Sequence, residues 1–288
     1  MKKLWLALWV CAALLPRAAA LSAAAAVTMD ADTGETLFAE NADSRLPMAS
    51  TTKIMTALVA LGEGGLDRVY TVKKQYAAVE GSSMYLEEGE RLTLRDTLYG
   101  LMLSSGNDAA AAVAGECGGE RAFVDKMNAK ARELGLTDTR FENPSGLPSD
   151  GHYTTARELA KITAAALRDP VFRDIVSTKT CTAAGRTLVN HNRLLSLYED
   201  AIGVKTGFTR AAGRCLVSAA ERNGRTVIAV TLNDPDDWND HIALLDDAFS
   251  RYSEVTLHEK GDTLAQTQVF GGETDRAELV AESTVTAY

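Results

Sequence analysis

A serine and a lysine stand three residues apart where a helix is expected to begin. Ser50 and Lys53 open an apolar stretch, residues 54–61, that would bury this helix on nearly every side. Three residues are just under one helical turn, so the hydroxyl and the amine share a face. A lysine whose pKa is lowered by burial can take the proton of a serine nucleophile, and helix N-terminal N–H groups suit an oxyanion hole. The alternative is an N-capping serine before a surface lysine, because chance supplies about one Ser-x-x-Lys in a chain this long.

A second short motif carries polar groups that could serve the same site. Ser105-Gly106-Asn107 follows an apolar run, and we expect a short loop that presents the hydroxyl and the amide on one side. Such a loop could relay protons through Ser105 and hold a peptide carbonyl or Lys53 through Asn107. A plain turn is the commoner meaning of such a tripeptide.

The third motif, Lys205-Thr206-Gly207, precedes the most strand-rich stretch of the chain. Its lysine and threonine offer a charge and a hydroxyl to a substrate carboxylate, and its glycine allows a ligand to approach the backbone closely. An exposed strand end is the alternative. The order of the three motifs, more than any one of them, therefore indicates a shared catalytic site.

Strands at the start of the domain and helices after them must position these motifs. Residues 25–29 and 35–39 are β-prone runs around a Gly-containing turn, which predicts a hairpin. Thr93 and Asp96 have the pattern of a helix start, and Thr155 with Glu158 forms a capping box for a helix that continues to residue 167. A further helix with a charged polar face is expected around residues 122–134.

Strand character returns late in the chain. Residues 215–220 and 226–232 flank Asn223-Gly224, a strong hairpin signal, and residues 236–252 have a helical pattern. Strands from both termini with helices between them imply one sheet with helices packed on it. We therefore expect residues 21–253 to form a single α/β unit.

The first twenty residues have the pattern of a secretory signal peptide. Two lysines precede an apolar run, residues 4–15, that is shorter than the roughly 20 residues needed to span a bilayer. Residues 18–20 are alanines and fit the small-residue cleavage rule, which predicts cleavage before Leu21. An uncleaved N-terminal anchor is the alternative.

Composition excludes several classes of protein. Of the 288 residues, 46% are hydrophobic and 24% are charged, which is the balance of an ordinary globular domain. The 39 acidic and 30 basic residues give a net charge of −9, so nucleic acid is not an expected partner. Three cysteines beyond the signal peptide (Cys117, Cys181 and Cys215) and scattered histidines fit neither a disulfide framework nor a metal site. We expect cysteines in the core, no metal and no cofactor.

Together the three motifs resemble the set found in penicillin-binding proteins and serine β-lactamases. The sequence around them resembles the low-molecular-mass D-alanyl-D-alanine carboxypeptidases over nearly all of residues 25–253. The segments that carry this likeness are Gly81–Leu86, Leu103–Ala110, Asn143–Leu147, Gly151–Ala156 and Gly203–Thr209. The resemblance implies a β-lactamase/transpeptidase-like fold, in which a five-stranded antiparallel sheet and a helical subdomain enclose the site. This agrees with the α/β (α+β) arrangement expected above.

The resemblance also implies catalytic roles. Ser50 would attack the carbonyl of the penultimate D-alanine of a peptidoglycan stem peptide, release the terminal D-alanine and form an acyl-enzyme that water hydrolyses. Lys53 would act as general base, while Ser105 and Asn107 would relay protons and fix geometry. Penicillins and other β-lactam antibiotics would acylate Ser50 as covalent inhibitors.

Substrate binding is implied for residues of the third motif. Lys205 and Thr206 would bind the terminal carboxylate, Gly207 would allow close approach, and the backbone N–H groups of the nucleophile and Phe208 would hold the oxyanion. His191 stands where some relatives carry a cation and is a further candidate for the carboxylate. A structural turn is the favoured interpretation of this histidine, because histidine is seldom fully charged at neutral pH.

Three other functions compete with this one. A D,D-endopeptidase that cuts cross-linked peptidoglycan uses the same motifs. A class A β-lactamase normally has Ser-Asp-Asn and a Glu-x-x-Leu-Asn segment, whereas this chain has Ser-Gly-Asn and no such segment. A non-catalytic cell-wall binding protein would be expected to have lost Ser50, Lys53 or Lys205, and all three are present.

The last part of the chain, residues 254–288, is β-prone and too short for a core of its own. Relatives commonly continue into a small β-rich domain and then an amphipathic helix that lies on the membrane surface. This segment resembles the opening strands of that domain, and no such helix follows it, so peripheral membrane association is not encoded in these residues. We expect an exported protein of the cell wall or outer membrane face, on the basis of the signal peptide alone.

Overall fold

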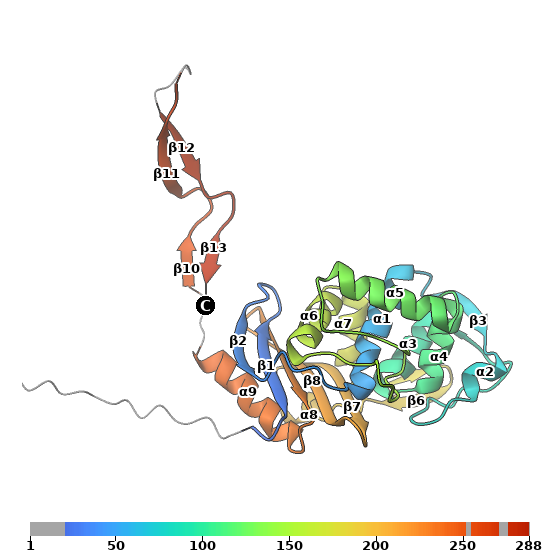
Figure 1. Cartoon of the computed structure of the whole chain (residues 1–288). Helices are drawn as coiled ribbons and strands as arrows, with labels where there is room; N and C mark the ends of the chain where they lie inside the picture. The colour runs from blue at the N-terminus through green and yellow to red at the C-terminus, as the bar shows by residue number, and fades with distance from the viewer. Residues whose placement is uncertain (1–20, 252–254, 271–275, 288) are drawn as a thin grey trace, which may run out of the picture.

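A five-stranded antiparallel sheet in the order β2-β1-β9-β8-β7 forms the centre of the molecule (Figure 1). The computed structural model describes residues 21–251, 255–270 and 276–287, so the expected signal peptide lies outside the described residues. The strands are β1 (Ala25–Asp30), β2 (Thr36–Glu40), β7 (Ala201–Thr209), β8 (Gly213–Arg222) and β9 (Arg225–Leu232). Because β1 pairs with β9, strands from the beginning and the end of the expected α/β unit meet in one sheet, as expected.

The Asn-Gly pair makes the hairpin that its sequence predicts. Arg222 pairs with Arg225 across β8 and β9, so the turn consists of two residues. Asn223 and Gly224 have φ angles of 54° and 82°, the left-handed values that a twisted hairpin of this kind requires.

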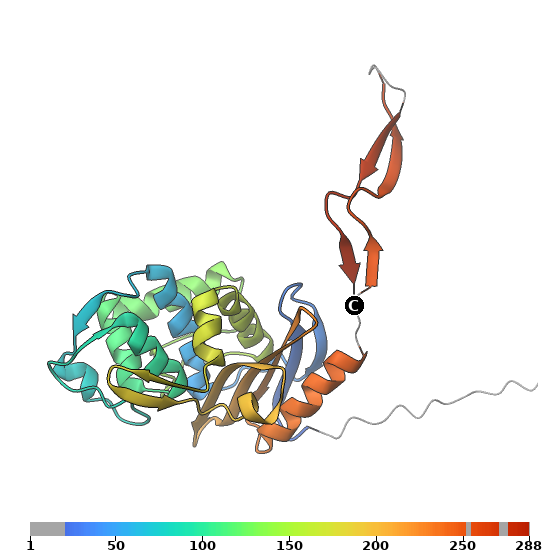
Figure 2. The same ribbon diagram turned by 180° about the vertical axis from the view of Figure 1, so that it is seen from behind.

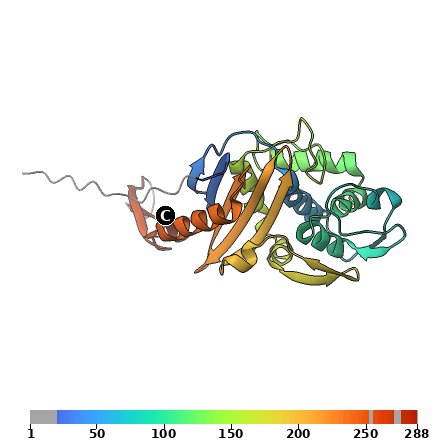
Figure 3. The ribbon, with the colours of Figure 1, turned by 90° about the horizontal axis from the view of Figure 1, so that it is seen from below.

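Helices cover both faces of the sheet (Figures 2 and 3). On one side lie α1 (Lys53–Glu63), α3 (Leu94–Leu103), α4 (Asn107–Glu116), α5 (Glu120–Glu133), α6 (Ala156–Leu167) and α7 (Pro170–Ser177). On the other side lie α8 (Leu194–Leu197) and α9 (Asp237–Arg251). Shorter elements extend the helical side, namely β3 (Val69–Thr71), α2 (Lys74–Ala77), β4 (Arg91–Thr93), β5 (Thr180–Ala183) and β6 (Arg186–Val189).

Strand β8 shows why the sheet needs both layers. Val217 and Ala219 pack into the larger core beneath the helical side, whereas Leu216 and Ala220 pack into a second core under α9. Successive side chains of a strand point to opposite faces, and here both faces are apolar. The strand is therefore buried on both sides and gives the site a rigid base.

Two expected helix starts differ in detail. Thr93 and Asp96 form the complete capping box of α3. Thr155 caps α6 by accepting from the Glu158 N–H, but the Glu158 carboxylate accepts hydrogen bonds from the loop at residues 137–139 instead of returning to the cap. The expected capping box is thus half formed, because the carboxylate closes a neighbouring loop.

Strands also occur near the end of the chain, in agreement with its β-prone sequence. Two antiparallel pairs form, β10 (Val255–His258) with β13 (Val285–Ala287) and β11 (Thr263–Gln268) with β12 (Arg276–Val280). Figure 1 shows both pairs apart from the central sheet and its helices. No helix of the described residues is long and apolar enough to cross a membrane.

The three cysteines are unpaired. Cys117 and Cys215 are buried, as expected of core residues, whereas Cys181 is half-buried on β5.

Candidate active site

Ser50 lies in a tight turn that immediately precedes α1. Residues Ala49–Thr52 form a 3-10 turn, and the α-helix proper begins at Lys53. Ala49 has φ 48°, an uncommon value for a residue with a side chain, so the turn is held from outside. Gly146 contributes, since a Cβ built on it would lie 1.9 Å from the Ala49 carbonyl oxygen. The expected helix start is confirmed, with Ser50 on a turn ahead of it.

A buried histidine supports the same turn. The Glu142 N–H donates to His152 Nδ1, so the ring proton lies on Nε2, which is 2.8 Å from the Thr52 hydroxyl. That hydroxyl donates in turn to the Ala49 carbonyl oxygen at 2.8 Å. Burial lowers the pKa of His152 to about 4, which keeps the ring neutral and this arrangement intact near neutral pH.

Lys53 joins the three sequence motifs at one nitrogen. Its Nζ lies 2.9 Å from Ser50 Oγ, 2.8 Å from Asn107 Oδ1 and 2.6 Å from the Ser145 carbonyl oxygen. The side chain is fully buried. Burial, followed by the positive charge of Lys205, holds the pKa of Lys53 well below its usual value, although Asp108 partly opposes this. A neutral amine at this position can accept the Ser50 proton.

The second motif has a different backbone from the one expected. Ser105, with φ 58°, takes the left-handed conformation, while Gly106 does not. Asn107 is the first residue of α4 and does not lie within the loop. Its Nδ2 donates to the Glu80 carbonyl oxygen at 2.7 Å, which leaves Oδ1 for Lys53. The amide is therefore held at both ends, as a positioning group requires.

Two loop-forming residues were not predicted individually. Asp108 accepts from the N–H groups of Met84 and Leu86 and thereby ties the segment 81–86 to α4. Asn143 accepts from the Gly146 N–H at 2.7 Å and donates to the Leu147 carbonyl oxygen, which orients the Ser145 carbonyl toward Lys53. Both residues lie inside segments that carried the resemblance, so a search for Asx turns could have found Asn143.

An open groove of about 450 Å³ runs above these buried groups. Its lining contains six of the predicted site residues, Ser50, Ser105, His191, Thr206, Gly207 and Phe208. The other three, Lys53, Asn107 and Lys205, lie beneath its surface with at most 5% of each residue exposed. All nine therefore gather at one place, in two layers.

Strand β7 forms one wall of the groove and is the edge strand of the sheet. Gly207 packs on the turn that contains Ser50, since a Cβ built there would lie 3.1 Å from the Ser50 nitrogen. Lys205 points inward and its Nζ donates to the Thr206 carbonyl oxygen at 2.9 Å. Burial lowers the pKa of Lys205 to about 7, so this lysine is only partly charged at neutral pH.

His191 is an exposed residue of the groove wall, and its backbone N–H donates to the Leu103 carbonyl oxygen. Partial burial of the ring and the charge of Lys205 lower the pKa of His191. At neutral pH the ring can therefore offer a hydrogen bond, and its charge contributes little.

Four further groove residues were missing from the predicted set. They are Ser82, Arg214, Asp237 and Trp238. Arg214 and Asp237 come from β8 and α9, whose sequence patterns indicate only secondary structure. The pairing of β7 with β8, which a single sequence does not reveal, brings them to the site.

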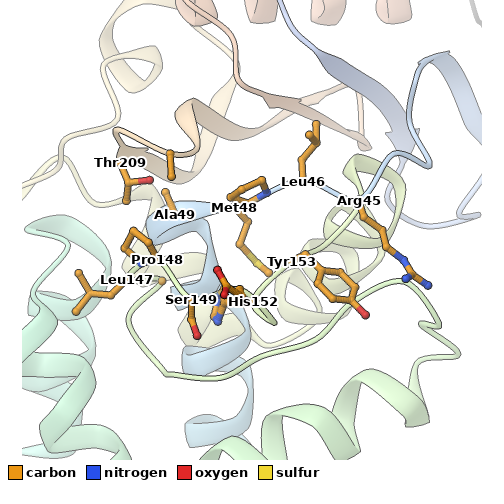
Figure 4. Close-up of a pocket in the computed structure, with 14 residues that line it drawn as sticks. Arg45, Leu46, Met48, Ala49, Leu147, Pro148, Ser149, His152, Tyr153 and Thr209 are labelled. Atoms are coloured by element: carbon orange, nitrogen blue, oxygen red, sulfur yellow. The ribbon is translucent and has the colours of Figure 1, made fainter.

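A second cavity, of about 370 Å³, lies beside the turn that contains Ser50 (Figure 4). Met48, Ala49 and His152 contribute to its lining, together with Tyr153 and Thr209. Ala49 in this lining is adjacent in sequence to Ser50 in the lining of the groove.

Comparison with known proteins agrees with the geometry of the groove. A family model described as D-alanyl-D-alanine carboxypeptidase matches residues 13–236. The chain belongs to this carboxypeptidase family. It is accordingly a hydrolase, a peptidase that acts as a D-alanyl-D-alanine carboxypeptidase, and the resemblance drawn from the motifs is confirmed.

Individual members of the carboxypeptidase family are similar over most of their length. The chain is 37% identical over 278 residues to D-alanyl-D-alanine carboxypeptidase DacF of Bacillus subtilis, covering 91% of this chain and 71% of that protein. It is 40% identical over 235 residues to a D-alanyl-D-alanine carboxypeptidase of Streptomyces sp. K15, covering 74% and 81%. A D-alanyl-D-alanine endopeptidase of Pseudomonas aeruginosa is 36% identical over 229 residues, covering 76% and 74%.

The fold of this chain is also similar to solved structures. The crystal structure of the Streptomyces K15 DD-transpeptidase superposes with a TM-score of 0.77 at 37% identity and covers 81% of this chain and 99% of that one. The expected transpeptidase-like fold is therefore confirmed.

Proposed function

We propose that this chain removes the terminal D-alanine from peptidoglycan stem pentapeptides through an acyl-enzyme on Ser50. The observation that carries this proposal is the contact of the fully buried Lys53 Nζ with both Ser50 Oγ and Asn107 Oδ1, at 2.9 and 2.8 Å, beneath the groove that Ser50 lines. A nucleophile and its base within hydrogen-bond distance, with the base oriented by a third group, is the arrangement that acyl transfer requires.

Acylation uses these groups in sequence. Neutral Lys53 takes the Ser50 proton while Oγ attacks the carbonyl carbon of the penultimate D-alanine. The oxyanion forms between the backbone N–H groups of Ser50 and Phe208, which the packing of Gly207 on the turn keeps close together. The intermediate then collapses, and the amine of the leaving D-alanine receives the proton from Lys53, with Ser105 as a relay. An ester of Ser50 remains.

Deacylation returns the enzyme to its starting state. A water molecule entering from the open groove attacks the ester carbonyl, and its proton passes to Lys53, directly or through Ser105. Lys53 then returns a proton to Ser50 Oγ as the ester C–O bond breaks. Thr206, at the groove surface, binds the substrate carboxylate, with Lys205 beneath it. A β-lactam would acylate Ser50 in the same way, and its opened ring would remain attached as part of the ester.

An endopeptidase acting on cross-linked stems is the second candidate, because a relative of that name is 36% identical. Both reactions pass through the same acyl-enzyme and differ in the size of the leaving group. The groove is open at one side, so access alone does not separate the two activities.

A direct test offers the protein two substrates. A pentapeptide stem and a cross-linked stem dimer are incubated separately, and free D-alanine and monomeric stem are measured. We expect D-alanine from the pentapeptide and much slower conversion of the dimer. Conversion of the dimer alone would instead assign an endopeptidase.

Family members act on cell-wall peptidoglycan. We further propose that this chain is exported to reach that substrate, with its first twenty residues as the signal. Removal of those residues from the expressed gene should leave the protein in the cytoplasm, detected by fractionation and penicillin labelling.

A further inference from the structure

The second cavity adjoins the catalytic groove along two segments of the chain. Met48 and Ala49 line the cavity (Figure 4), and the next residue, Ser50, lines the groove. On β7, Phe208 lines the groove, and Thr209, the last residue of the strand, lines the cavity. The groove and the cavity therefore follow one another along β7 and along the turn before α1.

The direction of a bound peptide follows from the roles proposed for β7. The C-terminal carboxylate would lie at Thr206, and the carbonyl of the penultimate residue at the Phe208 N–H, two residues further along the strand. Such a peptide runs antiparallel to β7, which is the edge strand of the sheet. Each residue of an extended peptide advances about 3.3 Å, so the residue before the penultimate D-alanine reaches the end of β7 at Thr209.

Much of the cavity lining is apolar. Half of its lining residues are apolar, Met48, Leu147 and Pro148 among them. His152 adds no positive charge near neutral pH, because burial lowers its pKa to about 4. An aliphatic side chain of several carbons is stabilised on such a lining, since its apolar surface is removed from water.

Two charged residues line the cavity, and only one of them is paired. Arg45 Nη2 lies 2.6 Å from Asp138 Oδ1, and the Arg45 guanidinium carbon lies 5.0 Å from the centre of the Tyr153 ring. Asp150 is exposed, and its carboxylate has no hydrogen bond or ion pair within the described part of the chain. One uncompensated negative charge therefore remains at the cavity, and an ammonium group would complement it.

We propose that this cavity binds the side chain of the stem residue that precedes the two D-alanines, and that it selects a long side chain ending in an amine. The aliphatic carbons of that side chain lie on the apolar lining, and its ammonium group pairs with Asp150. This inference rests on the proposed carboxypeptidase function and names its substrate class, stems in which this residue is a diamino acid. Asp150 is then a specificity-determining residue that takes no part in acylation.

Three N-acetylated tripeptides test the proposal, each ending in D-alanyl-D-alanine and beginning with lysine, norleucine or alanine. Norleucine has the four side-chain carbons of lysine without the amine, and alanine has neither. For wild type we expect kcat/KM to rise about tenfold or more from alanine to norleucine, because carbons are buried. A further rise of about two- to fivefold is expected from norleucine to lysine, the range for an exposed ion pair.

Substitutions at Asp150 should change the second of these two rises and not the first. In Asp150→Asn the lysine and norleucine peptides should be cleaved at equal rates, and in Asp150→Lys the lysine peptide should become the slower of the two. Asp150→Glu should keep part of the preference for lysine. Asp32→Asn is the matched control, since Asp32 is exposed in the β1–β2 turn and lines neither the groove nor the cavity, and it should leave all three rates unchanged.

Equal rates for the lysine and norleucine peptides in wild type, or an equal loss for all three peptides in Asp150→Asn, would overturn the proposal. Release of D-alanine would in either case still support the carboxypeptidase function. A circular-dichroism melting curve checks that each variant is folded. If wild type releases D-alanine from none of the peptides, the proposed function fails, and calorimetric titration of wild type and Asp150→Asn with the same peptides gives the comparison as dissociation constants.

Discussion

At the residue scale, the site contains two buried lysines, Lys53 and Lys205, whose charged forms are disfavoured by burial. Lys205 lowers the pKa of Lys53, and burial lowers the pKa of both. A lowered pKa would prepare Lys53 for the proposed role of base, while the cost of burying Lys205 falls on the folded state. The buried charge of Lys205 that lowers the pKa of Lys53 therefore also lowers the stability of the folded protein.

This opposition gives Lys205 a measurable pH signature. Its pKa is about 7 in the folded protein against an ordinary value of 10.5, so the unfolded chain binds the extra proton between these two values. The free-energy cost to folding of burying the protonated Lys205 is on the order of 5 kcal/mol. This cost is full at pH 7 and below, and it disappears as pH rises toward 10.5.

Lys205→Met should therefore gain stability relative to wild type at pH 7, and this advantage should shrink as pH rises to 10. Urea unfolding at several pH values measures it. The exposed Lys161→Met serves as the control, for which no such trend is expected. A Lys205→Met difference that stays constant from pH 7 to 10 would refute the buried-charge account.

At this scale, contacts that depend on local spacing could be predicted from the sequence. Ser50 and Lys53 are three residues apart, and their contact follows from helical geometry. Arg214 and Asp237 were missed because their contact depends on strand pairing and on where α9 docks.

At the element scale, the turn that contains Ser50 is held by a neighbouring loop. Gly146 has φ +88° and leaves no room for a Cβ beside the Ala49 carbonyl oxygen. Gly185, in the β5–β6 turn, has a similar φ of +69° but has nothing within 4 Å of its Cβ position. Substitutions at the two glycines therefore distinguish the cost of a left-handed backbone, which both would have, from the cost of a steric clash, which only Gly146 would have.

Gly185→Ala should cost about 1–2 kcal/mol of stability, from the left-handed backbone alone, and leave penicillin acylation unchanged. Gly146→Ala should carry the same cost and also displace the turn, with acylation at least about tenfold slower. Stopped-flow acylation with a fluorescent penicillin, together with thermal melts, measures both effects. Equal acylation rates in the two folded variants would show that the loop does not position Ser50.

Elements with strong periodicity were predicted from the sequence, and short ones were not. The β8–β9 hairpin, α3, α5, α6 and α9 were expected, whereas α2, α8 and the small β3–β4 and β5–β6 pairs were not. Three or four residues provide too little of a repeat to recognise. The left-handed conformation of Ser105 could not be predicted either, because it depends on the surrounding residues.

At the scale of the whole molecule, the sheet brings distant parts of the sequence to one site. Lys53 begins α1 near the start of the chain and Lys205 lies on β7. The order of the strands, with β7 at the edge and β1 beside β9, leaves β7 free to face the turn that contains Ser50. The joining of both termini in one sheet could be predicted, but the strand order could not.

The strands β10–β13 contribute no residue to the catalytic groove. A chain of residues 21–251 should therefore keep the penicillin acylation rate of the full chain, and its melting temperature should change by no more than a few degrees. Loss of acylation, or a large fall in melting temperature, would show that the late strands belong to the catalytic unit.

The central claim is that Ser50 is a nucleophile that forms a lasting acyl-enzyme. Intact-mass spectrometry after brief incubation with a penicillin tests it most directly, with Ser50→Ala in parallel and peptide mapping of the adduct. We predict that wild type gains the mass of one penicillin on the peptide that contains Ser50, and that Ser50→Ala gains none. An equal adduct on both proteins would contradict the claim, as would rapid penicillin hydrolysis by wild type without a detectable adduct.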